Sequence, residues 1–434
     1  MFISESLGSN EQGHLTIGGA DAVELARTYG TPLYVMDENL IRKNARLYRD
    51  SIDRYYGGRG RVLYASKAFS CKAACRLAAE EGLGLDVVSG GELRTAMSVG
   101  FPPEKICFHG NYKTPEEIDM ALDYGVGRFV LDNALEVERV GAAAAKRGIR
   151  TKCLVRITPG IDAHTHDFIM TGKIDSKFGT PIEKGAALRF IGEILKTEGI
   201  ELVGLHCHIG SQIFELEPFR HTAEVMIGFM AEIRDTYGAE LSELNLGGGF
   251  GIKYIESNDP VPYDKYIESV EGVIAEACRK HGLALPFVYM EPGRSLVGEA
   301  GTTLYTVGAI KEIEGVRTYV AIDGGMTDNP RYALYQADYT AAIANRINEP
   351  KSERVTIAGR CCESGDLIQE NTPIQKCESG DILAVFATGA YNYSMASNYN
   401  RVPRPPVVFV RDGQARLVVR RETFDDVCAL DVDE

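Results

Sequence analysis

Residues 61–68 read RVLYASKA, a short apolar run that predicts a β-strand leading into Lys67. Seven comparable runs follow, and a stretch of helical character separates most of them from the next. They are GLDVVSGG (84–91), ICFHGN (106–111), RFVLDN (128–133), KCLVRITP (152–159), ELVGLHCHIG (201–210), ELNLGGGF (243–250) and FVYMEPGR (287–294). Eight such units in about 230 residues are typical of a (β/α)8 barrel.

Polar residues and glycines gather at the carboxyl ends of these runs, which is where such a barrel places its active site. They are Lys67, Ser89, His109, Asn111, Arg156, His208, Ser211, Gly247 to Gly249, Glu291 and Arg294. A doubly wound sheet is the alternative, but it rarely uses the ends of all its strands for one site. We therefore favour the barrel.

One helix can be delimited from its terminal residues alone. In TPEEIDMALDYG (114–125), Thr114 suits an N-cap, Pro115 the first helical position and Glu117 the capping-box position. Gly125 is typical of a C-cap. The sequence predicts that this helix follows the third strand.

The character of the chain changes after Arg294. Residues 296–434 consist of strand-like segments separated by Gly, Pro and Asp turns, with one predicted helix near 337–346. Residues 1–35 resemble a strand with a lead-in that packs with this region. We therefore predict an N-terminal strand segment (1–35), a barrel domain (36–295) and a mostly-β domain (296–434).

Composition limits the classes of function. The 434 residues include 47 Lys and Arg against 61 Asp and Glu, a formal charge of −14, which argues against nucleic acid or an anionic membrane as the main partner. No apolar run approaches the ~20 residues of a membrane span, and no secretory signal is seen. Ten cysteines are too few for a disulfide scaffold, so we expect reduced thiols in the cytoplasm.

Two motifs are candidates for a nucleophile and for an anion-binding turn. A lysine that leaves a half-buried barrel core, as Lys67 does, gains a lowered pKa and becomes a nucleophile; the alternative is an ordinary surface lysine. Gly247–Phe250 (GGGF) would let backbone N–H groups approach an anion, although a simple tight turn is also consistent. The motifs GxGxxG and GxxxxGK[ST] are absent.

The histidines leave two readings open. In HCHIGSQ (206–212), His206 and His208 share one face of a strand, and HTH at 164–166 offers two more potential metal ligands. A zinc hydrolase is therefore one alternative, although HExxH is absent. In the other reading a histidine stacks on a flat aromatic cofactor, while Gly210 and Ser211 donate to its phosphate.

Two carboxylate motifs complete the set. In EPGRS (291–295), Glu291 could pair with a pyridine nitrogen and Arg294 with an anion, as pyridoxal 5'-phosphate (PLP) requires; otherwise the two form an ion pair that holds the turn. CESGD occurs twice, at 362–366 and 377–381. Its thiol could donate a proton and its glutamate could hold an ammonium group, or each copy is a turn between strands.

Taken together, these motifs resemble the PLP-dependent decarboxylases of the alanine-racemase-like fold, and in detail the diaminopimelate decarboxylases. The resemblance covers nearly the whole chain. It includes HGNYK, LHCHIGSQ, LNLGGGFGI, MEPGRS, DGGMTDNPRYALYQADY, CCESGD and GAYNYSMASNYN. RYALY stands where RPALY is common in the family, a departure that keeps Arg331 and Tyr335 in place.

The resemblance implies a role for each matching residue. Lys67 would bond covalently to PLP, His208 would stack on its ring, and Glu291 would pair with the ring nitrogen. The phosphate region would be surrounded by Ser211, Gly248, Gly249, Gly293, Arg294 and Tyr391. The substrate would be held by Arg294, Arg331, Tyr335, Glu363 and Tyr391. Cys362, rather than Cys377, would be the proton donor.

The resemblance also implies an activity and an assembly. The chain would decarboxylate meso-2,6-diaminopimelate to L-lysine and CO2, as a homodimer in which the Cys-Glu segment reaches the partner's active site. Rivals on the same scaffold are a racemase, for which a second base opposite Lys67 is needed, and other amino-acid decarboxylases. A PLP-binding protein without catalysis is a further rival, but such proteins are single barrels of about half this length.

Overall fold

The structure is a computed structural model that describes residues 2–161 and 176–432. The chain forms two compact units. We call the first the barrel unit, which comprises Ala45–Gly251 and Pro260–Gly293. The second, the β unit, comprises Met1–Asn44, Ile252–Asp259 and Arg294–Glu434.

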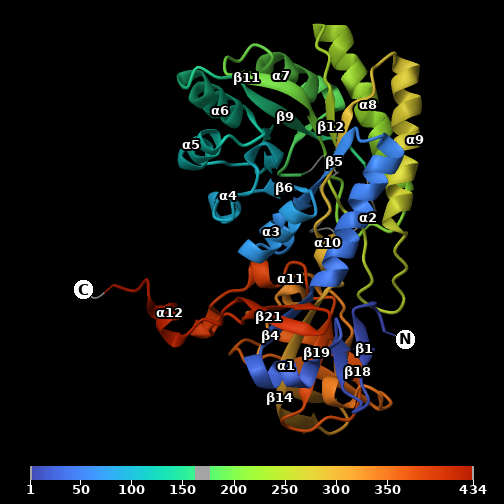
Figure 1. Cartoon of the computed structure of the whole chain (residues 1–434), viewed down its shortest axis with the longest axis vertical. Helices are drawn as coiled ribbons and strands as arrows, with labels where there is room; N and C mark the ends of the chain where they lie inside the picture. Colours follow the sequence, from blue (N-terminus) through green and yellow to red (C-terminus); the bar gives the residue numbers. More distant parts are fainter. Residues whose placement is uncertain (1, 162–175, 433–434) are drawn as a thin grey trace. The chain divides into compact units, whose positions relative to one another are not determined.

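The barrel unit contains a closed ring of eight parallel strands, labelled in part in Figure 1. In chain order they are β5 (Gly60–Ala65), β6 (Gly84–Val87), β7 (Ile106–Phe108), β8 (Arg128–Leu131), β9 (Thr151–Thr158), β11 (Ile200–His206), β12 (Glu243–Asn245) and β13 (Phe287–Met290). β13 pairs with β5, and β9 pairs with both β8 and β11, which closes the ring. All eight predicted strands and the barrel fold are confirmed.

One helix precedes the first strand of the ring and the others follow its strands, and they surround the ring in Figure 1. They are α2 (Glu38–Tyr56), which begins in the β unit, α3 (Lys72–Glu80), α4 (Gly90–Met97), α5 (Pro115–Tyr124), α6 (Ala134–Lys146), α7 (Ala186–Ile194), α8 (Glu217–Tyr237) and α9 (Tyr263–His281). The short β10 (Thr180–Pro181) pairs with β9. Helix α5 begins with a complete Thr114–Glu117 capping box and ends at Gly125 with φ 83°, as predicted.

The barrel interior is filled by side chains. Its core cluster takes one buried residue from each of six strands: Leu63, Cys107, Val130, Leu154, Val203 and Tyr289. At the amino-terminal ends of β8 and β12, Arg128 and Glu243 form an ion pair with an N–O distance of 2.6 Å. The barrel is therefore a packed core, and the strand ends opposite this pair remain for the site.

The β unit is built on a long mixed sheet with the strand order β18-β17-β15-β14-β4-β20-β21. These strands are β4 (Leu33–Asp37), β14 (Gly301–Ile313), β15 (Arg317–Ile322), β17 (Glu353–Ala358), β18 (Leu367–Ile374), β20 (Val407–Arg411) and β21 (Gln414–Val419). The N-terminal β4 lies between β14 and β20. A small sheet of β1 (Leu7–Ser9), β2 (Leu15–Ile17) and β3 (Ala20–Asp21) precedes α1 (Ala22–Tyr29).

The helix predicted near 337–346 is wrong. β16 (Ala341–Ile343) is a buried strand that pairs with β19 (Ile382–Phe386), and only a single 3-10 turn, Ala344–Arg346, follows it. The helix of this region, α11 (Arg331–Tyr335), lies upstream. The alanines favour a helix by intrinsic propensity, but pairing and burial against β19 outweigh that preference.

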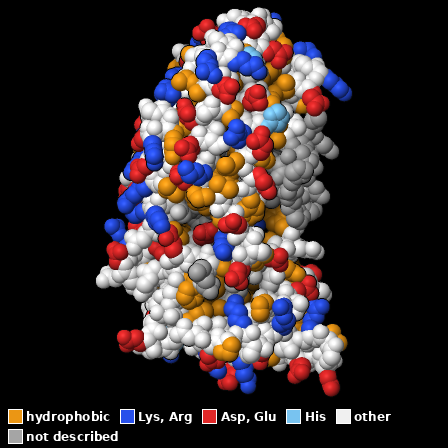
Figure 2. Space-filling model, turned by 90° about the vertical axis from the view of Figure 1, so that its right-hand side faces the viewer, with side chains coloured by type: hydrophobic (Ala, Val, Ile, Leu, Met, Phe, Trp, Pro, Cys, Tyr) orange, Lys and Arg blue, Asp and Glu red, His pale blue; other side chains and the backbone are white. Residues whose placement is uncertain are grey.

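The remaining helices of the β unit are α10 (Arg294–Val297) and α12 (Phe424–Cys428). All ten cysteines are free thiols. Within residues 2–161 and 176–432, no helix combines the length and apolar character needed to cross a bilayer. On the face drawn in Figure 2, acidic and basic side chains of the described residues are interspersed.

Candidate active site

Lys67 lies at the carboxyl end of β5, in a 3-10 turn formed by Ser66–Ala68. The turn is anchored by the Tyr64 hydroxyl, which donates to the Phe69 carbonyl at 2.7 Å. Ser66, Ala68 and Phe69 are buried, whereas Lys67 is exposed. The expectation of a half-buried Lys67 is therefore wrong, since the turn carries the side chain out of the core.

The predicted glycine cradle follows β12. Gly247 and Gly249 have φ values of 67° and 116°, which favour glycine. A Cβ at Gly248 would lie 2.2 Å from the Glu291 carbonyl oxygen, and one at Gly249 would lie 2.5 Å from the Gly210 carbonyl oxygen. Gly247 and Gly248 are buried and Gly249 is half-buried, so the cradle packs closely where a side chain would not fit.

His208 and Ser211 come from the loop after β11. The Gly248 N–H donates to His208 Nδ1 at 3.3 Å, which connects this loop to the glycine cradle. Burial, together with the positive charges of Lys67 and Arg156, holds the pKa of His208 well below its usual range. His208 is therefore a neutral imidazole with an accepting Nδ1. Ser211 is half-buried beside Gly210.

Glu291 lies directly after β13 and is the centre of a buried polar cluster. Asn245 Nδ2 donates to its Oε1 at 2.6 Å, His109 Nε2 lies 2.7 Å from Oε1, and His206 Nε2 lies 3.1 Å from Oε2. Burial alone would raise the pKa of Glu291, but the two histidines hold it well below its usual range. Glu291 is therefore an ionised carboxylate in the barrel mouth.

Three members of this cluster were not predicted as site residues: His109, His206 and Asn245. The sequence places His109 among the polar residues at the strand ends and offers His206 as a potential metal ligand, whereas it gives Asn245 no role. For Asn245 the signal would have been position, since it ends a barrel strand. Asp86, in β6, is also buried, and its Oδ1 lies 3.7 Å from His109 Nε2.

The metal alternative is weakened by the chemistry of its donors. Among the described residues, Cys107, His109 and Glu291 have potential ligand atoms within 4.8 Å of one another. Burial raises the pKa of the Cys107 thiol well above its usual value, which disfavours the thiolate that a metal needs. The HTH motif at 164–166 lies outside the described residues.

The β unit carries a second cluster, in which two buried arginines share one tyrosine. The guanidinium carbon of Arg294 lies 5.7 Å from the ring centre of Tyr254, and that of Arg331 lies 4.9 Å from it. Arg294 donates to the Tyr254 hydroxyl, and Arg331 donates to the Tyr339 hydroxyl at 3.0 Å. Arg294 also lies 4.8 Å from the ring centre of Tyr391.

Arg331 is 8% exposed, and no carboxylate pairs with it among the residues that the structure describes. Burial would lower the pKa of this guanidinium, but Tyr254 and Tyr339 raise it, so the charge is retained. Burying a cation whose only partners are tyrosines lowers the stability of the fold unless an anion pairs with it. The cluster is therefore a candidate carboxylate site. Tyr254 and Tyr339 were not predicted from the sequence.

The other predicted residues are placed as follows. Tyr335 is half-buried at the end of α11. Gly293 follows β13, and a Cβ there would lie 3.0 Å from the Ala65 Cβ, next to the Lys67 turn. Tyr391 has φ 61°, an unusual value for a bulky residue and one that is common at functional sites.

The two CESGD copies differ in exposure. Cys362 and Glu363 are exposed, whereas Cys377 is 5% exposed and belongs to a core cluster of the β unit. Burial raises the pKa of the Cys377 thiol to about 11. In both copies the final aspartate closes a turn: Asp366 accepts from the Cys361 N–H at 2.7 Å, and Asp381 accepts from the Glu378 N–H at 2.8 Å.

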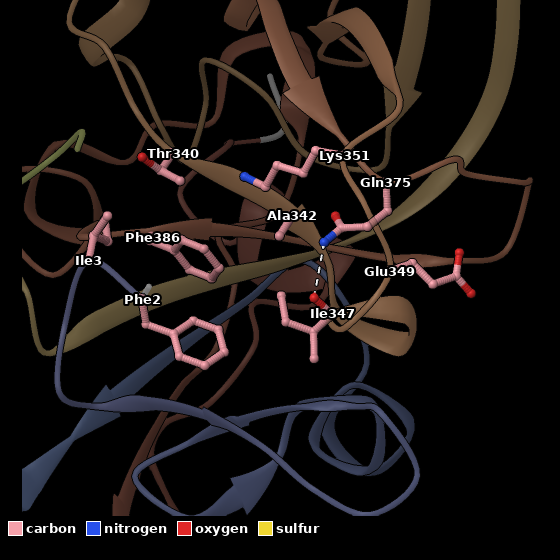
Figure 3. A pocket seen from close by; sticks show the side chains of 9 residues that line it. All are labelled: Phe2, Ile3, Thr340, Ala342, Ile347, Glu349, Lys351, Gln375 and Phe386. Atoms are coloured by element: carbon pink, nitrogen blue, oxygen red, sulfur yellow. Dashed lines mark hydrogen bonds between the residues drawn. The ribbon is translucent and has the colours of Figure 1, made fainter. Parts of the chain in front are cut away.

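A separate cavity of about 260 Å³ lies in the β unit and is drawn in Figure 3. It is lined by Phe2, Ile3, Thr340, Ala342, Ile347, Glu349, Lys351, Gln375 and Phe386, none of which was predicted as a site residue. Gln375 Nε2 donates to the Ile347 carbonyl at 3.3 Å, and Lys351 Nζ donates to the Ala341 carbonyl at 2.7 Å. Because the Gln375 amide and the Lys351 ammonium group already donate to backbone carbonyls, we do not favour this cavity as the active site.

Comparison with known proteins agrees with the geometry. Residues 38–298 match the family model of the pyridoxal-dependent decarboxylase, pyridoxal binding domain. A diaminopimelate decarboxylase of Bacillus subtilis is 52% identical over 432 residues, which are 100% of this chain and 98% of the relative. One of Staphylococcus aureus is 45% identical over 96% of this chain and 97% of the relative.

Solved structures give the same result. The diaminopimelate decarboxylase of M. jannaschii in complex with L-lysine superposes with a TM-score of 0.91, at 37% identity over 100% of this chain and 99% of that chain. The Helicobacter pylori enzyme, also with L-lysine, gives a TM-score of 0.85 at 30% identity over 94% of this chain and 99% of that chain. The chain therefore belongs to the diaminopimelate decarboxylase family of PLP-dependent decarboxylases.

Proposed function

We propose that the chain uses PLP to decarboxylate meso-2,6-diaminopimelate to L-lysine and CO2, the last step of lysine biosynthesis by the diaminopimelate pathway. Family membership supports the cofactor and the reaction class. The observation that carries the choice of substrate is Arg331, a buried guanidinium without a carboxylate partner among the described residues. A substrate with a second, distal carboxylate would supply that partner.

The residues of the barrel mouth fit PLP. A Cβ at Gly248 or Gly249 would meet backbone oxygen at 2.2 or 2.5 Å, so the close packing of this turn requires glycine. A glycine turn of this kind can present backbone N–H groups to a phosphate. A carboxylate has about four acceptor positions, and the three neighbours of Glu291 leave one for a protonated ring nitrogen. Bound there, PLP supplies an electron sink for the electrons of the broken Cα–carboxylate bond.

The roles of the individual residues follow from their chemistry and from the family resemblance. Lys67 would hold the cofactor covalently, since its exposed amine is accessible for that bond. Neutral His208 would stack on the ring without adding a positive charge beside it, and Glu291 would accept from the ring nitrogen. The phosphate would be bound by Ser211, Gly248, Gly249, Gly293, Arg294 and Tyr391.

The substrate is oriented by residues of the β unit. Arg331 and Arg294 bind the distal carboxylate, for which the planar guanidinium fork is suited. Tyr335 and Tyr391 line this subsite, and Glu363 binds the distal ammonium group. Cys362 then delivers a proton to Cα after CO2 has left. The exposure of Cys362 and Glu363 supports this assignment, because both are accessible at the surface of the chain.

We further propose a cytoplasmic homodimer with shared active sites. The exposed Cys362-Glu363 pair would reach the partner's site, in agreement with the family resemblance. The domain limits we propose are an N-terminal strand segment at 1–35, a cofactor-binding barrel at 36–295 and a mostly-β domain at 296–434. Small molecules, rather than nucleic acid or membrane, are the expected partners of this acidic chain.

Product analysis tests the proposed reaction. The PLP-loaded enzyme is incubated side by side with meso-, LL- and DD-diaminopimelate, and CO2 and lysine are quantified. We expect equal amounts of CO2 and L-lysine from the meso isomer and at least about tenfold slower turnover of the other two. Absence of CO2 from the meso isomer would overturn the proposal, and conversion between isomers without CO2 would indicate a racemase.

The duplicated motif gives a second prediction. We expect Cys362→Ala to lower kcat by about 10²-fold, the lower end of the range for a lost general acid. Cys377→Ala should keep kcat within about twofold and reduce only thermal stability, since it leaves a small cavity in the core. Both are measured by CO2 release and thermal unfolding. Loss of turnover in Cys377→Ala but not in Cys362→Ala would reverse the assignment.

A further inference from the structure

The environment of Glu291 suggests a role for residues that have so far served only as its neighbours. Its carboxylate is 7% exposed and is surrounded from three strands: His109 follows β7, His206 ends β11 and Asn245 ends β12. His206 and Asn245 are register partners, so the sheet itself fixes the two hydrogen-bond donors to Glu291. His109 Nε2 lies 2.7 Å from Glu291 Oε1 but makes no hydrogen bond among the described residues, so it acts on the carboxylate as a close polar neighbour. The arrangement leaves the carboxylate little freedom to rotate.

The charge states within the cluster are set by burial. Burial lowers the pKa of His206 to about 3, so its imidazole is neutral and its Nε2–H points to Glu291. Its Nδ1 has no hydrogen-bond partner among the described residues, as suits an accepting nitrogen, since an orphaned N–H would be costly. Burial also raises the pKa of Asp86. Of the two carboxyl groups beside His109, Glu291 is therefore the more readily ionised.

We infer that His109 and His206 are positioning residues that keep Glu291 ionised and correctly oriented to accept a hydrogen bond from the ring nitrogen of PLP. The inference rests on the role proposed for Glu291 above. A buried carboxylate that loses one of its donors becomes easier to protonate. A protonated Glu291 would no longer stabilise a positive charge on the ring nitrogen. The histidines thus act on the reaction through Glu291, without touching the substrate.

The experiment measures the protonation of the ring nitrogen directly. The enzyme is loaded with PLP that carries ¹⁵N in the ring, and the ¹⁵N chemical shift is recorded against pH for wild type, His109→Leu and His206→Leu. We expect each leucine variant to shift the protonation equilibrium of the ring nitrogen toward the neutral form by about tenfold or more. kcat should fall while KM stays within about twofold.

Rescue and control variants separate positioning from packing. His206→Gln restores an N–H donor and His109→Gln restores a polar group beside the carboxylate, and we expect both to recover most of the wild-type ¹⁵N shift. His221→Leu, an exposed histidine of α8, should leave both shift and kcat unchanged. If a leucine variant does not fold, His206→Phe and His109→Met remove the donor while filling the space, and the same comparison applies.

Two outcomes overturn the inference, and they can be told apart from failure of the proposed function. Leucine, phenylalanine or methionine variants that bind PLP with a wild-type ¹⁵N shift would show that the histidines do not control Glu291. The reference is Glu291→Gln. If Glu291→Gln alters the shift and the histidine variants do not, only this inference fails. If Glu291→Gln also leaves the shift unchanged, the role of Glu291 itself is wrong.

Discussion

Lys67→Ala is expected to lower kcat by at least about 10⁴-fold, because it removes the only covalent link proposed between the chain and PLP. The rest of the barrel mouth should persist, since Lys67 is exposed and its turn is held by Tyr64 and Phe69. CO2 release measures the loss. The mass of the intact, borohydride-reduced protein measures whether the cofactor is still attached.

Lys72→Ala is the matched control for this variant. Lys72 begins α3, five residues further on, and is likewise exposed. We expect it to keep wild-type turnover and the same cofactor adduct. An adduct of unchanged mass in Lys67→Ala would place the covalent bond on another lysine and remove the basis of the proposed mechanism.

The second large effect is expected when the residue that binds the distal carboxylate of the substrate is replaced. Arg331→Met should lower kcat/KM for meso-diaminopimelate by about 10³-fold, because the buried substrate carboxylate would then lose one of its two proposed guanidinium partners. Methionine fills similar space without a charge, so the fold should be retained. Steady-state kinetics and thermal unfolding measure the two effects separately.

Arg354→Met, on the exposed face of β17, is the control and should leave kcat/KM within about twofold. The contrary result is a wild-type KM for meso-diaminopimelate in Arg331→Met. In that case the buried guanidinium would be part of the framework of the β unit, and the distal carboxylate would be bound elsewhere.

Much of the fold could be predicted from the sequence because its signals are local. The eight barrel strands are short apolar runs. Thr114 and Pro115 mark the start of α5, and Gly125 marks its end. The helix predicted near 337–346 is wrong because a contact between segments far apart in the sequence decides the structure there. Alanine favours a helix locally, but the partner strand β19, about forty residues further on, decides the structure of Ala341–Ile343.

The candidate site was predictable where a residue type carries its chemistry in the sequence, as in the glycine cradle and Glu291. Asn245 was missed, and His109 was predicted only as a polar residue at a strand end, because the importance of both lies in their distance to Glu291, which depends on how the barrel closes. The exposure of Lys67 was misjudged because a 3-10 turn, rather than the strand, carries it. The sequence alone does not show that the strand ends before Lys67 and that a 3-10 turn, Ser66–Ala68, follows it.

The shared ring of Tyr254 has an evolutionary consequence. Arg294 and Arg331 both contact it, so any replacement of this tyrosine disturbs two cations at once. Contacting residues of this kind do not respond additively to substitution. Drift at these three positions should therefore be epistatic: a change tolerated in one descendant would be deleterious in another, and a new substrate preference would arise through concerted rather than stepwise replacement.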